Sequence, residues 1–155
     1  MSVFSEYQTD TIDLALDFYG YEDCPKNYEF GPSVRDNFVL HFVTKGKGVF
    51  HFNKKEIHLE AGDLFLLPKN KVTYYQADSE EPWSYYWIGI SGTKVSDFMR
   101  FSTLQEKGFL KKTEVDTERI GLFMEQLVHK AEASKMTSHY QLHLLSQIYE
   151  LLFLI

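Results

Sequence analysis

Residues 36–68 decide the fold class, because the stretch DNFVLHFVTKGKGVFHFNKKEIHLEAGDLFLLP contains several short strands in succession. Apolar and polar residues alternate in it with the period of two that is typical of a half-buried strand. The alternation predicts strands at 37–44, 48–52 and 56–59, and the apolar run at 64–68 predicts a fourth. Turn residues, above all glycines, separate these strands. Short antiparallel strands at this spacing indicate a barrel or a sandwich.

Two further strands are predicted at 72–77 and 83–90, and this hairpin is rich in aromatic residues. The segment 74–87 includes six aromatic side chains, although the chain as a whole is only 16% aromatic. A buried core is filled more simply by Leu, Ile and Phe, because these carry no hydroxyl or indole N–H that needs a partner. Tyr and Trp suit a surface that is partly apolar and partly wet, such as a small-molecule pocket. The six rings are Tyr74, Tyr75, Trp83, Tyr85, Tyr86 and Trp87.

The second part of the chain has the period of helices instead of strands. Helices are predicted at 92–101, 116–134 and 138–155, and the short gap before the last one predicts an antiparallel helical hairpin. No linker or repeat divides the 155 residues, so we expect a single domain, with a barrel at about 20–92 and helices at about 93–155. The ending YELLFLI is apolar and lacks a helix-stop residue, which predicts that a longer protein continues beyond it.

The composition is that of an ordinary globular chain, with 44% hydrophobic and 25% charged residues. The net charge is −6 and no basic cluster is present, which argues against nucleic-acid binding by this segment itself. The single cysteine, Cys24, excludes an intrachain disulfide and fits a reducing compartment. There is no signal-peptide pattern, and no apolar run approaches the ~18 residues of a membrane span. We therefore expect a cytoplasmic protein without membrane contact.

Residues 61–78, AGDLFLLPKNKVTYYQAD, resemble the second motif of the cupin barrels, in which a metal-binding His ends a Gly- and Pro-containing turn. Thr73 stands at the position of that His. In the stretch that resembles the first cupin motif, Val39 stands at the position of the metal-binding Glu, and the family's two His fall near Ser33 and Arg35. Zinc, iron and manganese need His or carboxylate ligands there. The resemblance therefore predicts a cupin barrel with no metal and no other cofactor.

The stretches LHFVTKGKGVF, GDLFLLP and EPWSYYWIGISG, followed by helices, resemble the N-terminal effector-binding domain of AraC-type transcription regulators. The resemblance is strongest to members that regulate sugar use in Gram-positive bacteria. It implies a mainly β chain with some α, in which a cupin-like antiparallel β-barrel (jelly roll) is followed by a C-terminal helical hairpin. It also implies a domain that senses a saccharide effector and dimerises. The helix-turn-helix units that bind DNA in such regulators are expected downstream of this chain.

The strands can be phased from the same resemblance. If Arg35 and Val39 occupy former ligand positions, they point into the barrel, and alternation sends His41 inward as well. Phe38 and Leu40 then face outward and need the helices as cover. Across the later hairpin, Tyr74 and Tyr86 face outward while their neighbours face inward. The predicted ligand-binding residues are Arg35, His41, Tyr75, Tyr85 and Trp87.

The resemblance also gives roles to these residues. Tyr75 and Trp87 match a Tyr and a Trp that hold the sugar in the arabinose-binding member of the family. Tyr85 falls on the position of the family's His, and Arg35 lies near its Arg. An indole face stacks on the apolar face of a sugar ring, while Arg, His and Tyr hydrogen-bond its hydroxyls.

Other interpretations of these residues remain open at this point. The rings are also compatible with plain core packing, His41 with a satisfied core histidine, and Arg35 with a salt bridge to Asp36 or Glu22. A metal-free cupin enzyme acting on a sugar, of the isomerase or epimerase type, would need an acid–base pair in the barrel. His41 and Tyr85 supply such a pair in principle. A pure interaction module with a filled barrel is a third possibility.

The last predicted helix carries apolar residues on more than one side. A helix that is apolar on most sides is buried on most sides, so one side is expected to cover the barrel and another to contact a second chain. This predicts a homodimer through the C-terminal helices, with Leu145, Ile148 and Leu152 at an isologous interface.

Overall fold

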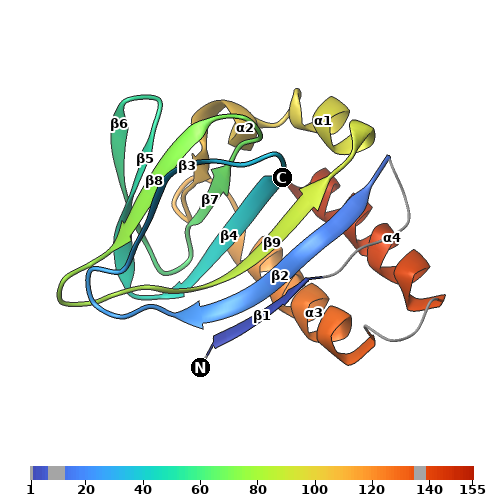
Figure 1. Ribbon diagram of the computed structural model, residues 1–155, viewed down its shortest axis with the longest axis horizontal. Coiled ribbons are helices and arrows are strands. Elements are labelled where there is room, and N and C mark those ends of the chain that lie inside the picture. The colour runs from blue at the N-terminus through green and yellow to red at the C-terminus, as the bar shows by residue number, and fades with distance from the viewer. Residues whose placement is uncertain (1, 7–12, 135–138) are drawn as a thin grey trace.

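The computed structural model of the chain describes residues 2–6, 13–134 and 139–155. Its strands form two antiparallel sheets that face each other (Figure 1), one six-stranded with the order β1-β2-β9-β4-β7-β10 and one four-stranded with the order β3-β8-β5-β6. The strands are β1 Ser2–Glu6, β2 Ala15–Asp23, β3 Glu29–Val34, β4 Phe38–Lys45, β5 Lys47–Phe52, β6 Lys55–Glu60, β7 Leu64–Leu67, β8 Val72–Ala77, β9 Ser84–Ser91 and β10 Phe109–Leu110.

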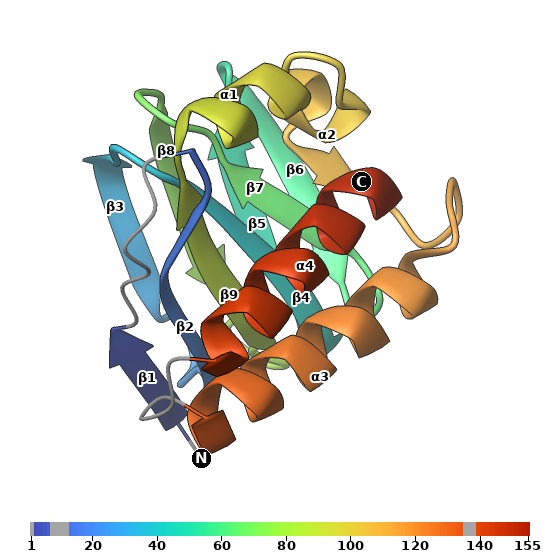
Figure 2. The ribbon, with the colours of Figure 1, turned by 90° about the vertical axis from the view of Figure 1, so that its right-hand side faces the viewer.

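Four helices follow the main strands, namely α1 Thr93–Met99, α2 Thr103–Lys107, α3 Thr117–Ser134 and α4 His139–Leu154. Figure 2 shows α3 and α4 side by side and antiparallel across the outer face of the six-stranded sheet. The predicted class, an antiparallel β-barrel followed by a helical hairpin, is therefore confirmed. The Gly108 backbone, with φ 84°, ends α2 and turns the chain into β10.

Two hydrophobic cores lie on opposite faces of the six-stranded sheet. On β4, Val39 and Val43 are buried between the two sheets, whereas Phe38 and Leu40 are buried under the helices. The predicted alternation is confirmed, because a strand sends successive side chains to opposite faces. Phe42 is only partly buried, and it packs against the helix-covered core.

The barrel includes strands that the sequence pattern did not predict. β1 precedes the expected start near residue 20 and β2 overlaps it, β3 lies within the expected barrel where no strand was predicted, and β10 lies within the expected helical part. β2 pairs with β1 on one side and β9 on the other, and it is buried on both faces at several positions, so it lacks simple alternation. β3 contains Gly31 and Pro32, which usually indicate a turn and here accompany a bulge.

The structure corrects one residue of the predicted dimer face. Ile148 is fully buried in the chain's own core, so it cannot contact a second chain. Leu145 and Leu152 are partly buried at the edge of that core. The large apolar and aromatic residues that α4 does expose are Tyr140, Leu142, Tyr149 and Phe153.

Candidate ligand-binding pocket

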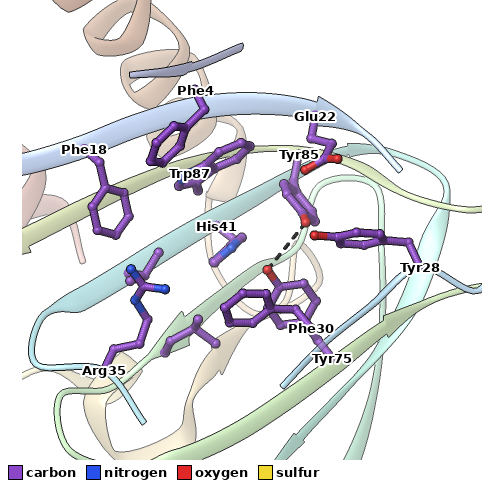
Figure 3. Close-up of a pocket in the computed structure, with 12 residues that line it drawn as sticks. Phe4, Phe18, Glu22, Tyr28, Phe30, Arg35, His41, Tyr75, Tyr85 and Trp87 are labelled. Atoms are coloured by element: carbon purple, nitrogen blue, oxygen red, sulfur yellow. Dashed lines mark hydrogen bonds between the residues drawn. The ribbon is translucent and has the colours of Figure 1, made fainter. Parts of the chain in front are cut away.

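A cavity of about 510 Å³ opens inside the barrel between the two sheets. Its walls include all the residues predicted to bind a ligand, which are Arg35, His41, Tyr75, Tyr85 and Trp87. Figure 3 shows these side chains pointing toward one another from β4, β8, β9 and the segment before β4. The volume lies within the range of about 300–1,000 Å³ that is usual for small-molecule sites. The other lining residues are Phe4, Phe18, Glu22, Tyr28, Phe30, Val39 and Leu67.

Strand pairing brings the predicted rings together. His41 on β4 lies opposite Trp87 on β9, and Phe30 on β3 lies opposite Tyr75 on β8. Their outward neighbours face away from the pocket, as alternation predicts: the Tyr74 hydroxyl donates to Glu29 Oε2 at 2.6 Å. One period-two pattern therefore separates the rings that line the cavity from those that cover the outside.

Tyr75 and Tyr85 form the inner wall of the pocket and are almost completely buried. Their rings meet edge to face at 6.0 Å, and the Tyr85 hydroxyl donates to the Tyr75 hydroxyl at 3.5 Å. Burial raises the pKa of both phenols far above the usual value, so both stay protonated. Each therefore offers a ligand a neutral hydroxyl that can donate or accept.

His41 packs edge to face against both phenols and is only 2% exposed. Its ring stacks on Phe65 at 4.3 Å, and its Nδ1 has no hydrogen-bond partner among the described residues. Burial lowers the pKa of His41 to about 3, so the imidazole is neutral at physiological pH. This burial outweighs the effect of a backbone hydrogen bond with Val39, which favours the protonated form.

Arg35 lies at one end of the pocket, and hydrogen bonds on the side away from the cavity orient its side chain. Its Nε donates to Asn37 Oδ1 at 3.4 Å, and Asn37 Nδ2 donates in turn to Asp17 Oδ2 at 3.3 Å. The guanidinium also lies 4.9 Å from the centre of the Phe18 ring, at cation–π distance. Within the described residues Arg35 forms no ion pair with Asp36 or Glu22, which leaves its terminal nitrogens available to a ligand.

Several lining residues come from strands that the sequence pattern does not predict. Phe4 is on β1, Phe18 and Glu22 are on β2, and Phe30 is on β3. The signal that was available is the local alternation of Phe18, Gly20 and Glu22 on one face of β2. This alternation indicates which side chains line the pocket only in combination with the pairing of β2 and β9.

The residues at the former cupin ligand positions do not fit a metal. Val39 is apolar and Thr73 offers only a hydroxyl, while Arg35 is a cation. Across residues 2–6, 13–134 and 139–155, no group of three or more His, Cys, Asp or Glu side chains has a geometry that could hold a metal ion.

The pair His41 and Tyr85 is poorly suited to acid–base catalysis. Their rings are 5.0 Å apart, but the pKa of His41 falls to about 3 and that of Tyr85 rises far above its usual value. An efficient general acid or base has a pKa near the working pH. The two pKa shifts therefore argue against acid–base catalysis by this pair.

None of the helices in the described part of the chain is both long and apolar enough to span a membrane.

Comparison with protein families and known proteins gives one consistent result. A family model described as the AraC-like ligand binding domain matches residues 15–152. The chain is 46% identical over 104 residues to the Msm operon regulatory protein of Streptococcus mutans, which covers 67% of this chain and 37% of the relative. It is 41% identical over 100 residues to the raffinose operon transcriptional regulatory protein of Pediococcus pentosaceus, which covers 63% and 36%.

A third relative is the lactose operon transcription activator of Staphylococcus xylosus, with 31% identity over 119 residues, 76% of this chain and 43% of the relative. The chain spans less than half the length of each of these proteins.

Solved structures are similar in fold alone. The Escherichia coli protein YhaK has a TM-score of 0.51 with 13% identity, over 59% of this chain and 45% of that one. A cupin superfamily protein from Desulfitobacterium hafniense has a TM-score of 0.43 with 13% identity, over 57% of this chain and 76% of that one.

Proposed function

Since the chain belongs to the family of AraC-like ligand-binding domains, we propose that it senses a saccharide inside its barrel and dimerises through α4. Two relatives are named after operons for raffinose and lactose, which supports a saccharide effector in a transcription regulator. DNA contacts of the whole protein are proposed to lie outside this chain, in keeping with its net charge of −6. Such a regulator acts in the cytoplasm.

The observation that carries the proposal is the convergence of five side chains on one cavity. Trp87 offers an indole face to the apolar face of a sugar ring. Arg35 offers donors, and the neutral hydroxyls of Tyr75 and Tyr85 can donate or accept. An aromatic pocket with a few placed polar groups is the usual composition of a specific small-molecule site.

Isothermal titration of the chain with raffinose, lactose, melibiose and galactose tests the proposal. We expect at least one saccharide to bind, and Trp87→Ala to weaken its affinity by about tenfold or more, equivalent to 1.4 kcal/mol. Tyr74→Ala is the matched control, because this ring lies on the outer face of the same sheet system and does not line the pocket. Equal affinity of the wild type and Trp87→Ala would contradict the role of Trp87.

The dimer proposal rests on the exposed side of α4. Leu142, Leu145, Tyr149 and Leu152 are spaced by three and four residues, which is the spacing of a coiled-coil seam. Leu142 is 75% exposed, so the seam is open along this part of the helix. Two copies of α4 that pack along the seam would bury it in an isologous interface.

Sedimentation at micromolar concentration distinguishes the two sides of α4. We expect a wild-type dimer and a folded Leu142→Glu monomer, because the change places a charge at the interface but not in the core. Val72→Glu is the control, since Val72 is similarly exposed at 62% but lies on the four-stranded sheet. A monomeric wild type would contradict dimerisation through this helix.

A further inference from the structure

Glu22 is a carboxylate inside the pocket that no predicted role accounts for. It lies on β2 directly opposite Tyr85 on β9, and its side chain lines the cavity. Figure 3 shows Glu22 next to Tyr85 and Tyr28, with Arg35 at the other end of the pocket and His41 between the two ends. The cavity therefore carries one cation and one anion at opposite ends.

No contact within the described part of the protein compensates for the partial burial of the Glu22 carboxylate. Among the described residues it has no hydrogen bond and no ion pair. Loss of water around it raises the pKa of Glu22, and no donor offsets that effect. A folded-state pKa above the unfolded value means that the ionised group lowers the stability of the free protein at neutral pH. A partly desolvated carboxylate without a donor in the protein is suited to accept hydrogen bonds from a ligand in the cavity.

We propose that Glu22 is the specificity-determining residue of the pocket, accepting hydrogen bonds from the hydroxyls of a neutral saccharide and excluding sugars that carry a phosphate or carboxylate at that end. This inference rests on the proposed saccharide function. Two hydroxyl donors on neighbouring ring carbons match the two oxygens of a carboxylate. An anionic group would instead meet a like charge in a partly desolvated site, which is unfavourable.

Among the described residues that line the pocket, Glu22 is the group whose charge changes when the pH is lowered from neutrality through its raised pKa. The pKa values of Tyr28, Tyr75 and Tyr85 are raised by burial, that of Cys24 is raised to about 11, and that of His41 is lowered to about 3. Arg35 keeps its charge throughout. Protonation of Glu22 removes its negative charge and turns one of its two acceptor oxygens into a donor, so affinity for a neutral sugar whose hydroxyls donate to the carboxylate falls as the pH is lowered through its raised pKa.

Titration calorimetry of wild type and Glu22→Gln with raffinose, lactose, galactose, lactose 6-phosphate and galacturonate tests the inference. We expect the wild type to bind a neutral sugar and not its charged counterpart, and to lose affinity on acidification. Glu22→Gln should bind the neutral sugar about 10- to 100-fold more weakly at pH 7, the range for a hydrogen bond to a charged group. Its affinity should not depend on pH. Glu29→Gln, an outer-face carboxylate, should behave as the wild type.

Thermal unfolding of the free proteins separates a ligand-binding role from a structural one. Glu22→Gln should unfold at the same temperature as the wild type or higher, because it removes an unpaired desolvated charge. A lower unfolding temperature would make Glu22 a structural residue and overturn the inference. Unchanged sugar affinity in Glu22→Gln, or a wild type that prefers the charged sugars, would overturn it too, while the saccharide function would stand. If none of the saccharides binds either protein, the proposed function itself fails.

Discussion

The two faces of the six-stranded sheet are packed in different ways. The face under α3 and α4 is covered by aliphatic side chains, and among its buried residues only Tyr19 and Phe38 are aromatic. In the core between the two sheets, half of the buried residues are aromatic, including Phe65, Trp83 and Tyr85. Flexible aliphatic chains fill space closely. Large rigid rings with polar atoms leave a cavity and line it with hydrogen-bonding groups.

The difference teaches that one sheet can form a closely packed core on one face and line a cavity, the proposed binding site, on the other. Leu40 and His41 are neighbours on β4, yet Leu40 lies in the helix-covered core and His41 lines the pocket. His41 retains an unpaired buried nitrogen, whereas its neighbour has no polar atom to satisfy. Substitutions on the two faces should therefore change different measurements.

The largest effect is expected on the helix-covered face. Leu40→Ala should lower the free energy of unfolding by about 2–5 kcal/mol, because it removes a fully buried side chain and leaves a cavity. Urea unfolding measures this change. Affinity for a saccharide should be unchanged under conditions where the variant is folded. A large loss of affinity in the folded variant would show that the two faces are not independent.

The pH dependence of stability tests the contrast between the two faces at His41, the residue next to Leu40. Unfolded His41 takes up a proton below about pH 6.5, whereas the folded residue stays neutral down to about pH 3, so stability falls as the pH is lowered through that window. Between pH 6.5 and 4.5 the loss should reach about 2–3 kcal/mol, at 1.4 kcal/mol per pH unit.

His41→Phe should remove this part of the pH dependence and keep the stacking on Phe65. Urea unfolding at several pH values compares it with the wild type. Equal slopes in the wild type and His41→Phe would contradict burial of a neutral imidazole.

The tightly packed surroundings of Trp83 should be less tolerant of substitution than the pocket lining. A Cβ added at Gly48 would lie 2.5 Å from Cε3 of the fully buried Trp83. Gly48→Ala should therefore lower the free energy of unfolding by about 1–3 kcal/mol. In a Trp83→Leu background the same change should have almost no effect, and a double-mutant cycle measures the coupling. Equal effects in both backgrounds would mean that Trp83 is not the obstacle.

The smallest effect is expected on the outer rings. Tyr74→Phe removes an exposed hydrogen bond to Glu29 and should lower the free energy of unfolding by at most about 1 kcal/mol, with no change in saccharide affinity. The same change at Tyr85 removes a hydroxyl that faces the pocket and should weaken saccharide binding. If the affinities respond in the reverse order, the inward phase assigned to β9 does not describe the binding site.

Much of the fold could be predicted because the pattern in the central strands is strong. Alternation placed Val39 inside and Leu40 outside, and the helical period gave α3 and α4 nearly to the residue. The N-terminal strands could not be predicted in this way. β2 has strand neighbours on both sides and buried positions on both faces, so its sequence carries no simple period.

The pocket was predictable in part for the same reason. Tyr75, Tyr85 and Trp87 were placed by their phase, and the structure brings them together with Arg35 and His41. Glu22 was considered only as a partner for Arg35, because nothing local indicates which strand lies beside it. Ile148 was assigned to the dimer face, since the apolar residues of α4 cover more than one side and the sequence does not say which side meets the barrel.

The sequence by itself determined which side chains share a face, because the direction of a side chain along a strand or helix is a local property of the backbone. It therefore fixed the inward rings, the outward aliphatic residues and the absence of metal ligands at Val39 and Thr73. Only the tertiary structure decided which faces meet. The pairing of β2 with β9 brings Glu22 beside Tyr85, and the packing of α4 buries Ile148 but leaves Leu142 exposed. These outcomes depend on contacts between residues far apart in the chain. The free energy gained by burying one face instead of another is the sum over many side chains, so no single local pattern reveals it.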